Sequence, residues 1–340
     1  MKVTEHLKNA NGKTLFSIEV LPPLKGENIR RLFDHMDPLM EFKPPFVDVT
    51  YHREEYVYKK KENGLLEKQS TRKRPGTVGI CAAIQNYYKV DTVPHIICGG
   101  FSREETENAL IDLQFLGIDN VLVLQGDAIK NEGRFVPEPD GHHYASELLE
   151  QVIKMNHGIY LDDELQNTTP TNFCVGVAGY PEKHFWAPNL KTDMKYLKAK
   201  VDMGAEYIVT QMFFDNKKYF DFVARCRAEG IDVPIIPGIK PITTKAQTNI
   251  LPTIFHIDLP EALADEVEKC KDNTAVKEVG VEWAINQSKE LIEFGVPTLH
   301  FYSMGKSDPI YRIAKGLFWG VRVIWPHFGY LFHGRAITIC

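Results

Sequence analysis

Short apolar runs rich in β-branched residues alternate with longer amphipathic segments along the whole chain, and this alternation constrains the fold most strongly. The candidate strands are residues 15–22, 46–52, 94–100, 120–127, 172–181, 207–215, 233–241 and 298–304. Nearly continuous apolar runs are typical of parallel strands that are covered on both faces. Eight such strands separated by helices predict a (β/α)8 TIM-type barrel in the α/β class.

The segments between these runs carry helix signals. Ser102 and Glu105 have the spacing of a capping box, and the helical pattern that follows them stops at Gly117. Apolar residues at one-turn spacing predict a helix over residues 192–205. Residues 79–88 also favour a helix, although a strand over them is possible.

Three further segments complete the outline of the predicted structure. Residues 253–294 predict two helices before the last strand, and the basic run at 68–76 predicts a solvated loop. No linker or internal repeat divides residues 1–318, so we expect a single domain. Residues 319–340 form an aromatic-rich tail whose purpose the sequence does not reveal. A doubly wound open sheet is the alternative fold, but the G-x-G-x-x-G turn expected after its first strand is missing.

Composition narrows the class of protein. A formal net charge of −5 gives no reason to expect a nucleic-acid partner. The 6 cysteines include no C-x-x-C pair, which fits a reducing compartment better than a disulfide framework or a zinc site. The N-terminus is polar, and no apolar run reaches the length of a membrane span. We therefore expect a cytoplasmic protein with no membrane partner.

Polar side chains fall at the carboxyl ends of the predicted strands, which is where a barrel of this kind builds its site. The residues at these ends are Glu19, Thr50, His52, Asp127, Tyr180, Gln211, Lys240, Tyr302 and Lys306. His95 falls nearer a strand start and is supported less by this rule. Taken singly, each has a structural explanation, for example Asp127 as a turn cap or Tyr180 as a packed aromatic. Their convergence on one rim favours a functional site.

Several motifs that mark other classes of enzyme are missing from the sequence. The sequence has no metal-ligand spacing, no G-x-S-x-G elbow and no Walker-type phosphate loop. We therefore expect no metal ion. Two carboxylates with amide and hydroxyl groups indicate proton transfer around a bound organic cofactor or heterocycle.

The motifs, taken in order, resemble those of the methylenetetrahydrofolate reductase family. They are "FSIEVLPP", "FVDVTYH", "PHIICGG", "LVLQGD", "VAGYPEKH", "KAKVDMGAEYIVTQMFFD", "IPGIKPI" and "LHFYSMGK", and the likeness runs from about residue 13 to residue 318. The resemblance implies a catalytic barrel that binds FAD. It also implies reduction of 5,10-methylenetetrahydrofolate to 5-methyltetrahydrofolate with NADH or NADPH as hydride donor, in one-carbon and methionine metabolism. A homo-oligomer is possible.

The resemblance also implies residue roles. Glu19 is similar to the general acid that protonates the folate N10, and Asp127 to a carboxylate that contacts the pterin and tunes the flavin. The residues similar to flavin binders are Thr50, His95, Gly126, Asp127, Tyr144, Ala145, Tyr180, His184, Asp193 and Lys200. The residues similar to substrate contacts are Gln211, Gln247 and Lys306.

Two positions depart from the family pattern. Gln125 stands where the family commonly has an arginine before Gly-Asp, so a cation near the cofactor diphosphate is lost unless another residue supplies one. Leu251 falls about where some members place an aromatic side chain under the nicotinamide. These departures affect cofactor binding.

Glu19 carries the mechanism that we expect. A glutamate in water has a pKa of roughly 4.3 and holds almost no proton at neutral pH. Burial in the apolar run "LFSIEVLPP" should raise the pKa of Glu19 towards roughly 6–7, the range of general-acid carboxyls, while Asp127 at a more polar turn stays ionised. Other readings remain open: a different flavin-dependent barrel oxidoreductase similar to proline dehydrogenase, a metal-dependent barrel hydrolase, or a flavin- or folate-binding carrier.

Overall fold

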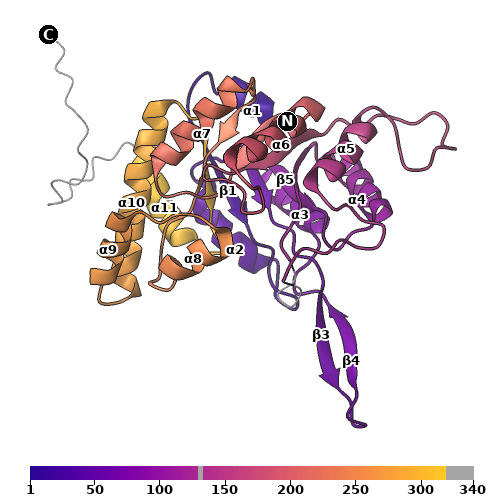
Figure 1. Ribbon diagram of the computed structural model, residues 1–340, viewed down its shortest axis with the longest axis horizontal. Coiled ribbons are helices and arrows are strands. Elements are labelled where there is room, and N and C mark those ends of the chain that lie inside the picture. The colour runs from indigo at the N-terminus through magenta and orange to yellow at the C-terminus, as the bar shows by residue number, and fades with distance from the viewer. Residues whose placement is uncertain (129–132, 319–340) are drawn as a thin grey trace.

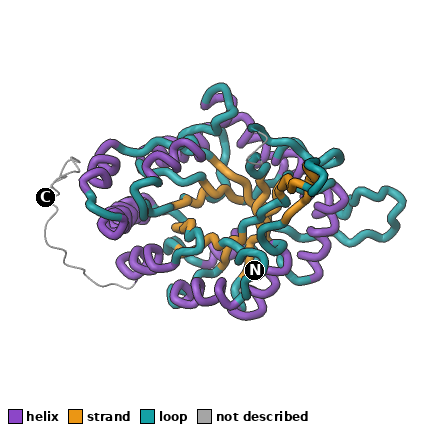
Figure 2. Tube along the Cα trace, turned by 90° about the horizontal axis from the view of Figure 1, so that it is seen from below, coloured by secondary structure: helices purple, strands orange, loops and turns teal. Residues whose placement is uncertain are grey.

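A ring of parallel strands surrounded by helices forms the body of the molecule, as Figure 2 shows from below. The computed structural model describes residues 1–128 and 133–318. The ring strands are β1 (Leu15–Val20), β2 (Phe46–Val49), β5 (Asp91–Ile97), β6 (Asn120–Leu124), β7 (Cys174–Gly179), β8 (Tyr207–Thr210), β9 (Ile235–Ile236), β10 (Gly238–Ile239) and β11 (Thr298–Tyr302).

Helices follow the strands and cover the outside of the ring (Figure 1). They are α1 (Val3–Asn9), α2 (Arg30–Met40), α3 (Thr77–Tyr88), α4 (Arg103–Phe115), α5 (Ala145–Asn156), α6 (Leu190–Met203), α7 (Asn216–Ala228), α8 (Gln247–Phe255), α9 (Glu261–Lys269), α10 (Asn273–Phe294) and α11 (Ser307–Phe318). The alternation of strands and helices confirms the predicted single-domain α/β barrel.

The ring closes through β9 and β10, which are two halves of one predicted strand. β9 pairs with β8 and β10 pairs with β11, and only Pro237 separates the two halves. Proline has no N–H to donate, so it interrupts the ladder. Its carbonyl oxygen still accepts a hydrogen bond from the backbone N–H of His300 at 3.1 Å. With β9 and β10 counted as one strand, the barrel has the predicted eight.

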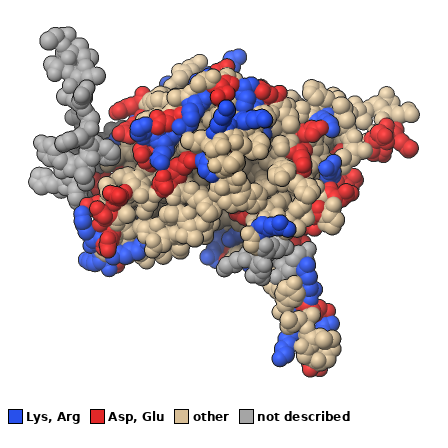
Figure 3. All heavy atoms as spheres, viewed as in Figure 1, with Lys and Arg blue, Asp and Glu red and all other residues tan. Residues whose placement is uncertain are grey.

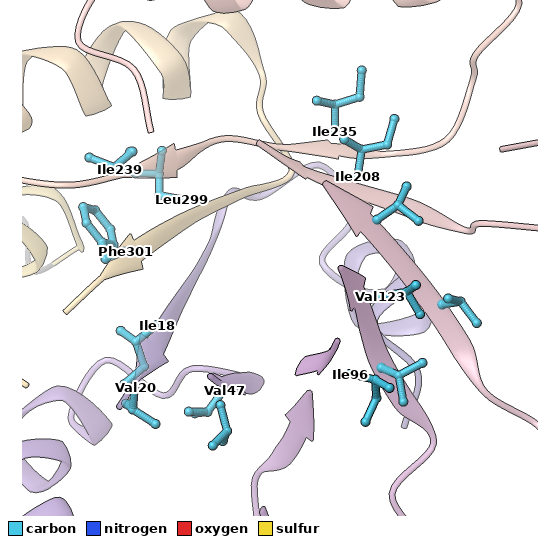
Figure 4. Packing of buried hydrophobic residues seen from close by; sticks show 14 of the residues in the cluster. Ile18, Val20, Val47, Ile96, Val123, Ile208, Ile235, Ile239, Leu299 and Phe301 are labelled. Carbon is cyan, nitrogen blue, oxygen red and sulfur yellow. The ribbon is translucent and has the colours of Figure 1, made fainter. Parts of the chain in front are cut away.

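Side chains alternate between the two faces of each strand, as the two-residue period of a strand requires. The outward-facing residues pack against the helices in the main hydrophobic cluster, and Figure 4 shows Ile18, Val47, Ile96, Leu299 and Phe301 among them. This packing explains why the strands read as continuous apolar runs in the sequence.

The lower half of the barrel interior is apolar. Phe46, Val93, Leu122 and other side chains near the strand starts form a second cluster, and Val3 of α1 packs into it. The backbone N–H of Val3 also donates a hydrogen bond of 2.7 Å to the side chain of Asn120. The first helix therefore plugs the amino-terminal end of the barrel, away from the strand ends that build the site.

The helix signals in the sequence are confirmed. Ser102 and Glu105 form the capping box that begins α4. α6 stops at Gly204 as predicted, and the segment 79–88 is helical. α9 and α10 are the two helices predicted within 253–294.

The prediction of a loop over 68–76 is partly wrong, because a β-hairpin occupies this part of the chain. β3 (Glu55–Lys60) and β4 (Leu66–Thr71) pair in antiparallel fashion and extend away from the barrel (Figure 1). Most of the described side chains of the hairpin are exposed, so the strands lack the apolar alternation that marks a buried face.

Surface properties agree with the balanced composition. Acidic and basic side chains are interspersed on the face shown in Figure 3. Within the described residues, no helix is long and apolar enough to cross a membrane, and no group of three or more His, Cys, Asp or Glu side chains could hold a metal ion. The tail at 319–340 lies outside the described residues.

Candidate active site

The upper half of the barrel interior is polar, in contrast to the apolar lower half. The side chains in this layer come from β1, β2, β5 and β11, which are neighbours in the sheet. They are Ser17, Glu19, Asp48, His95, His300 and Tyr302. The strand register places Glu19 beside Asp48 on one side and beside Tyr302 on the other. Barrel interiors are usually filled by apolar side chains, so this layer calls for a functional explanation.

Glu19 lies at the carboxyl end of β1, and its side chain is only 12% exposed. Its Oε2 atom is 3.7 Å from Nε2 of His95. Burial raises the pKa of Glu19 to about 7; His95 lowers it, Asp48 raises it, and Lys240 lowers it. The upward shift agrees with the expectation from the sequence, although Asp48, one of the three charged neighbours of Glu19, was not identified from the sequence.

Asp48 lies deeper in the barrel, and its side chain is 1% exposed. Its Oδ2 atom is 3.6 Å from the same Nε2 atom of His95, and its Oδ1 atom is 4.0 Å from Nδ1 of His300. The hydroxyl of Ser17 lies 2.8 Å from that Nδ1 atom. Within the part of the chain that the structure describes, no group donates a hydrogen bond to either carboxylate oxygen of Asp48 at normal distance.

His95 lies closer to the rim than the sequence indicated. The predicted strand began at residue 94, but β5 begins at Asp91, so His95 is in the second half of the strand. Burial lowers the pKa of His95, but the carboxyl groups of Asp48 and Glu19 raise it, and the net shift is upward. A raised pKa favours the imidazolium between the two carboxyl groups.

Asp127 lies just beyond the end of β6, at an exposed position of the rim. The protein atoms around its carboxyl raise the pKa of Asp127, the guanidinium of Arg53 opposes this, and the net shift is upward. Gly126 before it has a φ of 85°, a left-handed conformation that suits glycine. Gln125 donates a hydrogen bond of 2.7 Å to the carbonyl oxygen of His143.

Arg53 places a cation near Asp127 that the sequence analysis did not identify. Its side chain lies against Gly99 and Gly100, where any added Cβ atom would come within about 3 Å of it. Its Nη1 atom donates a hydrogen bond of 3.2 Å to the carbonyl oxygen of Val136. Gly99 and Gly100, two consecutive glycines soon after β5, are the only local sign in the sequence that a long side chain crosses there.

Four predicted flavin binders gather after β7. The rings of Tyr180 and His184 are 4.6 Å apart, and the backbone N–H of His184 donates a hydrogen bond of 2.9 Å to Asp193. Nζ of Lys200 donates a hydrogen bond of 3.2 Å to the carbonyl oxygen of Ala178. Burial lowers the pKa of Lys200 to about 8, and Asp193 opposes this shift. Burial also raises the pKa of Tyr180, with Asp193 and Asp127 nearby.

Three other predicted flavin contacts lie at the start of α5 and after β2. Tyr144 is the N-cap residue of α5, where no side chain caps the helix, and Ala145 is its first residue. Thr50 follows β2, and its hydroxyl lies 3.3 Å from Nε2 of His52.

The three predicted substrate contacts differ in exposure and in the hydrogen bonds that they make. Gln211 lies just after β8 at the rim, and its side-chain oxygen accepts a hydrogen bond of 2.9 Å from the N–H of Met212. The side-chain oxygen of Gln247 accepts hydrogen bonds from the N–H groups of Thr243 and Thr244, so it also shapes the start of α8. Lys306 is exposed in the loop after β11.

Lys240 and Leu251 are two further residues that the sequence analysis singled out. Lys240 is buried, and burial lowers its pKa to about 8; Glu19 raises it, and Lys306 lowers it. The three charges therefore lie near one another. Leu251 is 3% exposed and packs among Met212, Ile242 and Ile257.

Sequence reasoning missed Asp48 and His300, which lie in the middle of apolar runs. In the sequence, Asp48 stands two residues before Thr50, and His300 two residues before Tyr302, so each is in step with a candidate at the end of its own strand. Polar residues at inward positions of predicted barrel strands are the signal that could have identified them.

Comparisons with known proteins place the chain in a family. The family model described as methylenetetrahydrofolate reductase matches residues 2–317. The chain is 33% identical over 329 residues to methylenetetrahydrofolate reductase (NADH) 1 of Arabidopsis thaliana, covering 93% of this chain and 51% of that protein. It is 31% identical over 312 residues to methylenetetrahydrofolate reductase 2 of Saccharomyces cerevisiae, covering 89% and 47%.

A bacterial relative matches over nearly its full length. The chain is 29% identical over 321 residues to the 5,10-methylenetetrahydrofolate reductase of Escherichia coli, covering 94% of this chain and 95% of that protein. By contrast, the chain spans about half the length of the yeast and plant relatives. Because the family model covers most of the 340 residues, the chain belongs to the methylenetetrahydrofolate reductase family.

Proposed function

We propose that this protein reduces 5,10-methylenetetrahydrofolate to 5-methyltetrahydrofolate, with FAD as bound cofactor and NADH or NADPH as hydride donor. Family membership and the near full-length match to the bacterial relative support the reaction. The observation that carries the chemical step is Glu19, a carboxyl group at the barrel rim with a pKa of about 7. Residues 1–318 are proposed to form the catalytic unit.

Glu19 is the proposed proton donor. A group with a pKa of about 7 is protonated in roughly half of the molecules at neutral pH, so it can give a proton and regain it. Transfer of this proton to N10 of the folate breaks the bond between N10 and the bridging carbon. The electron pair of N5 then forms a double bond to this carbon, and the cationic iminium accepts the hydride to become the methyl group.

Asp127 is the proposed stabiliser of that cation. It is exposed at the rim; the protein atoms around its carboxyl raise its pKa, and the nearby guanidinium of Arg53 opposes this shift and favours the ionised form. A carboxylate near the pterin lowers the free energy of the positively charged iminium. Gln211, Gln247 and Lys306 are the proposed folate contacts, with Lys306 supplying a charge for a carboxylate of the substrate.

The residues around β7 and α5 suit an anionic cofactor such as FAD. Burial lowers the pKa of the Lys200 ammonium to about 8, and a bound anion would oppose this shift and favour the charged form. The start of α5 at Tyr144 and Ala145 has no side-chain cap, and free N–H groups at a helix start favour phosphate.

The other proposed FAD contacts are Thr50, His95, Gly126, Asp127, Tyr180, His184 and Asp193. Arg53 supplies a cation at the rim that Gln125 does not. Bound FAD would supply the ring that takes a hydride from the nicotinamide and gives it to the folate.

Separate assays of the two half-reactions test this function. We would load the purified protein with FAD, reduce it anaerobically with NADH or NADPH, and then add methylenetetrahydrofolate. We expect flavin bleaching in the first step and its return with formation of methyltetrahydrofolate in the second. In Glu19→Gln, bleaching should stay normal while the folate step slows by at least about 10²-fold, the scale of a lost general acid.

Glu107→Gln is the matched control, because Glu107 of α4 is a buried carboxyl whose pKa is also raised by burial. This variant should keep both half-reactions. A wild-type protein that binds no flavin, or whose reduced flavin is not reoxidised by the folate, would overturn the proposed function. A normal folate step in Glu19→Gln would overturn only the role of Glu19.

A further inference from the structure

One nitrogen atom of His95 lies between two carboxyl groups inside the barrel. Nε2 is 3.6 Å from Oδ2 of Asp48 and 3.7 Å from Oε2 of Glu19. An imidazole nitrogen carries at most one hydrogen, so the two carboxyl groups compete for it. Either Asp48 or Glu19, but not both, can therefore accept the Nε2 hydrogen of His95.

Asp48 is the more deeply buried of the two carboxyl groups. Its side chain is 1% exposed, compared with 12% for Glu19. A buried carboxylate is costly unless it is paired, and within the described chain the imidazoles of His95 and His300 lie within 4.0 Å of the Asp48 carboxyl. Burial lowers the pKa of His300 and keeps that imidazole neutral, so His95, whose pKa is raised, is the cationic partner of Asp48. Glu19 retains some contact with solvent and can remain neutral by holding a proton.

His300 lies near the second carboxyl oxygen of Asp48, and Ser17 contacts the ring of His300. Ser17 and His300 are partners in the β1–β11 register, and the hydroxyl of Ser17 lies 2.8 Å from Nδ1 of His300. The same nitrogen is 4.0 Å from Oδ1 of Asp48. The carboxyl group of Asp48 therefore lies between two imidazoles, with Oδ2 nearer to His95 and Oδ1 nearer to His300.

We propose that Asp48 is a positioning residue for the proton donor: it engages the Nε2 hydrogen of His95, and Glu19, denied this ion pair, keeps its own proton. The proposal rests on the proposed role of Glu19 as general acid. When Glu19 gives its proton to the folate N10, it becomes a carboxylate 3.7 Å from the imidazolium of His95. The proton that restores Glu19 comes from solvent or from His95, which solvent then reprotonates.

The remaining titratable groups that face this pair do not compete for the role. They are Cys81 from α3, Tyr207 from β8, Tyr302 from β11 and Lys240 after β10. Burial raises the pKa of the thiol and of both phenols, so these groups stay neutral at the pH of the experiment. Lys240 carries charge near Glu19 and lowers the pKa of Glu19.

Two variants with opposite expected effects test the proposal. Asp48→Asn removes the negative charge and leaves a similar shape, so His95 becomes available to Glu19 and Glu19 should lose its proton at lower pH. Lys240→Met removes a neighbouring cation, so Glu19 should keep its proton to higher pH. A general loss of folding would not move the two variants in opposite directions.

The readout is the pH dependence of flavin reoxidation by methylenetetrahydrofolate after reduction by NADH, measured on the full chain by rapid mixing. The limb on which the rate falls with rising pH should move down by about one unit in Asp48→Asn, a rate loss of about tenfold at a pH on that limb. It should move up in Lys240→Met.

An infrared titration gives a second readout that does not depend on turnover. The carboxylic C=O band that is lost in Glu19→Gln should titrate at lower pH in Asp48→Asn than in the wild type. Thr298→Val is the matched control, because Thr298 is fully buried and faces inward two residues before His300 on β11. It should leave both readouts unchanged.

Each outcome decides one claim. A pH limb and an infrared band in Asp48→Asn that match Thr298→Val, or that move to higher pH, would overturn the proposal for Asp48. Unimpaired folate reduction in Glu19→Gln would instead refute the acid role on which it rests. If Asp48→Asn does not fold, Asp48→Ser provides the same loss of charge with a smaller side chain.

Discussion

The hydroxyl of Tyr302 donates a hydrogen bond of 2.6 Å to the carbonyl oxygen of Thr210 and so joins β11 to β8 across the barrel seam. The strand between them, β9 with β10, has only two residues in each half. Gly238 lies directly under this hydrogen bond, and a Cβ atom there would be 2.4 Å from both oxygen atoms. The closure of the barrel therefore depends on a glycine at this position.

Gly238→Ala should destabilise the protein by about 2–3 kcal/mol, because a methyl group cannot fit without moving β8 or β11. Gly79→Ala is the matched control, since a Cβ atom at Gly79 in α3 meets nothing within 4 Å. The control should gain up to about 1 kcal/mol from improved helix propensity. Urea unfolding curves measure both, and equal midpoints for the two variants would show that the seam tolerates a side chain.

The stability of the protein should depend on pH through Glu19. The folded-state pKa of Glu19 is about 7 and its ordinary value is 4.5. Between these values the folded protein holds a proton that the unfolded chain has released, so stability falls as the pH rises through this window. Glu19→Gln removes this dependence, and its stability relative to wild type should improve by up to about 3 kcal/mol from pH 4 to pH 8.

The measurement is the free energy of unfolding of the cofactor-free protein at several pH values. Glu164→Gln changes an exposed loop position and is the control, which should follow the wild-type curve. A Glu19→Gln curve parallel to that of the wild type would contradict a neutral Glu19 in the folded protein.

Arg53 should contribute to FAD binding if it supplies the cation that Gln125 does not. Arg53→Gln should raise the dissociation constant for FAD by about 10-fold or more, the scale of a lost charge-assisted hydrogen bond. Arg31→Gln removes an exposed arginine on α2 and should have little effect. Titration of flavin fluorescence distinguishes them, and equal dissociation constants would exclude Arg53 from the cofactor site.

The hairpin of β3 and β4 should be dispensable for folding of the barrel. None of its described side chains belongs to a hydrophobic cluster, and its ends, Glu55 and Thr71, are paired neighbours that a short linker can join. Replacement of residues 55–71 by Gly-Gly-Ser should change the free energy of unfolding by less than about 1 kcal/mol. A larger loss in thermal or urea unfolding would show that the hairpin packs against the body.

The sequence by itself determined the barrel, because strand and helix periods are local. The alternation of apolar runs and amphipathic segments, with the capping box at Ser102, predicts the elements without knowledge of their neighbours. The rule that sites form at strand ends also identified Glu19 and Asp127 as candidates.

Only the tertiary structure decided which side chains surround Glu19 and where the ring closes. Asp48 and His300 lie more than two hundred residues apart in the chain, and the parallel register brings them to within 4.0 Å. Electrostatic interaction depends on distance and burial, and neither can be read from a local pattern. The same holds for the hairpin, because exposed strands have no buried face to impose a period on their sequence.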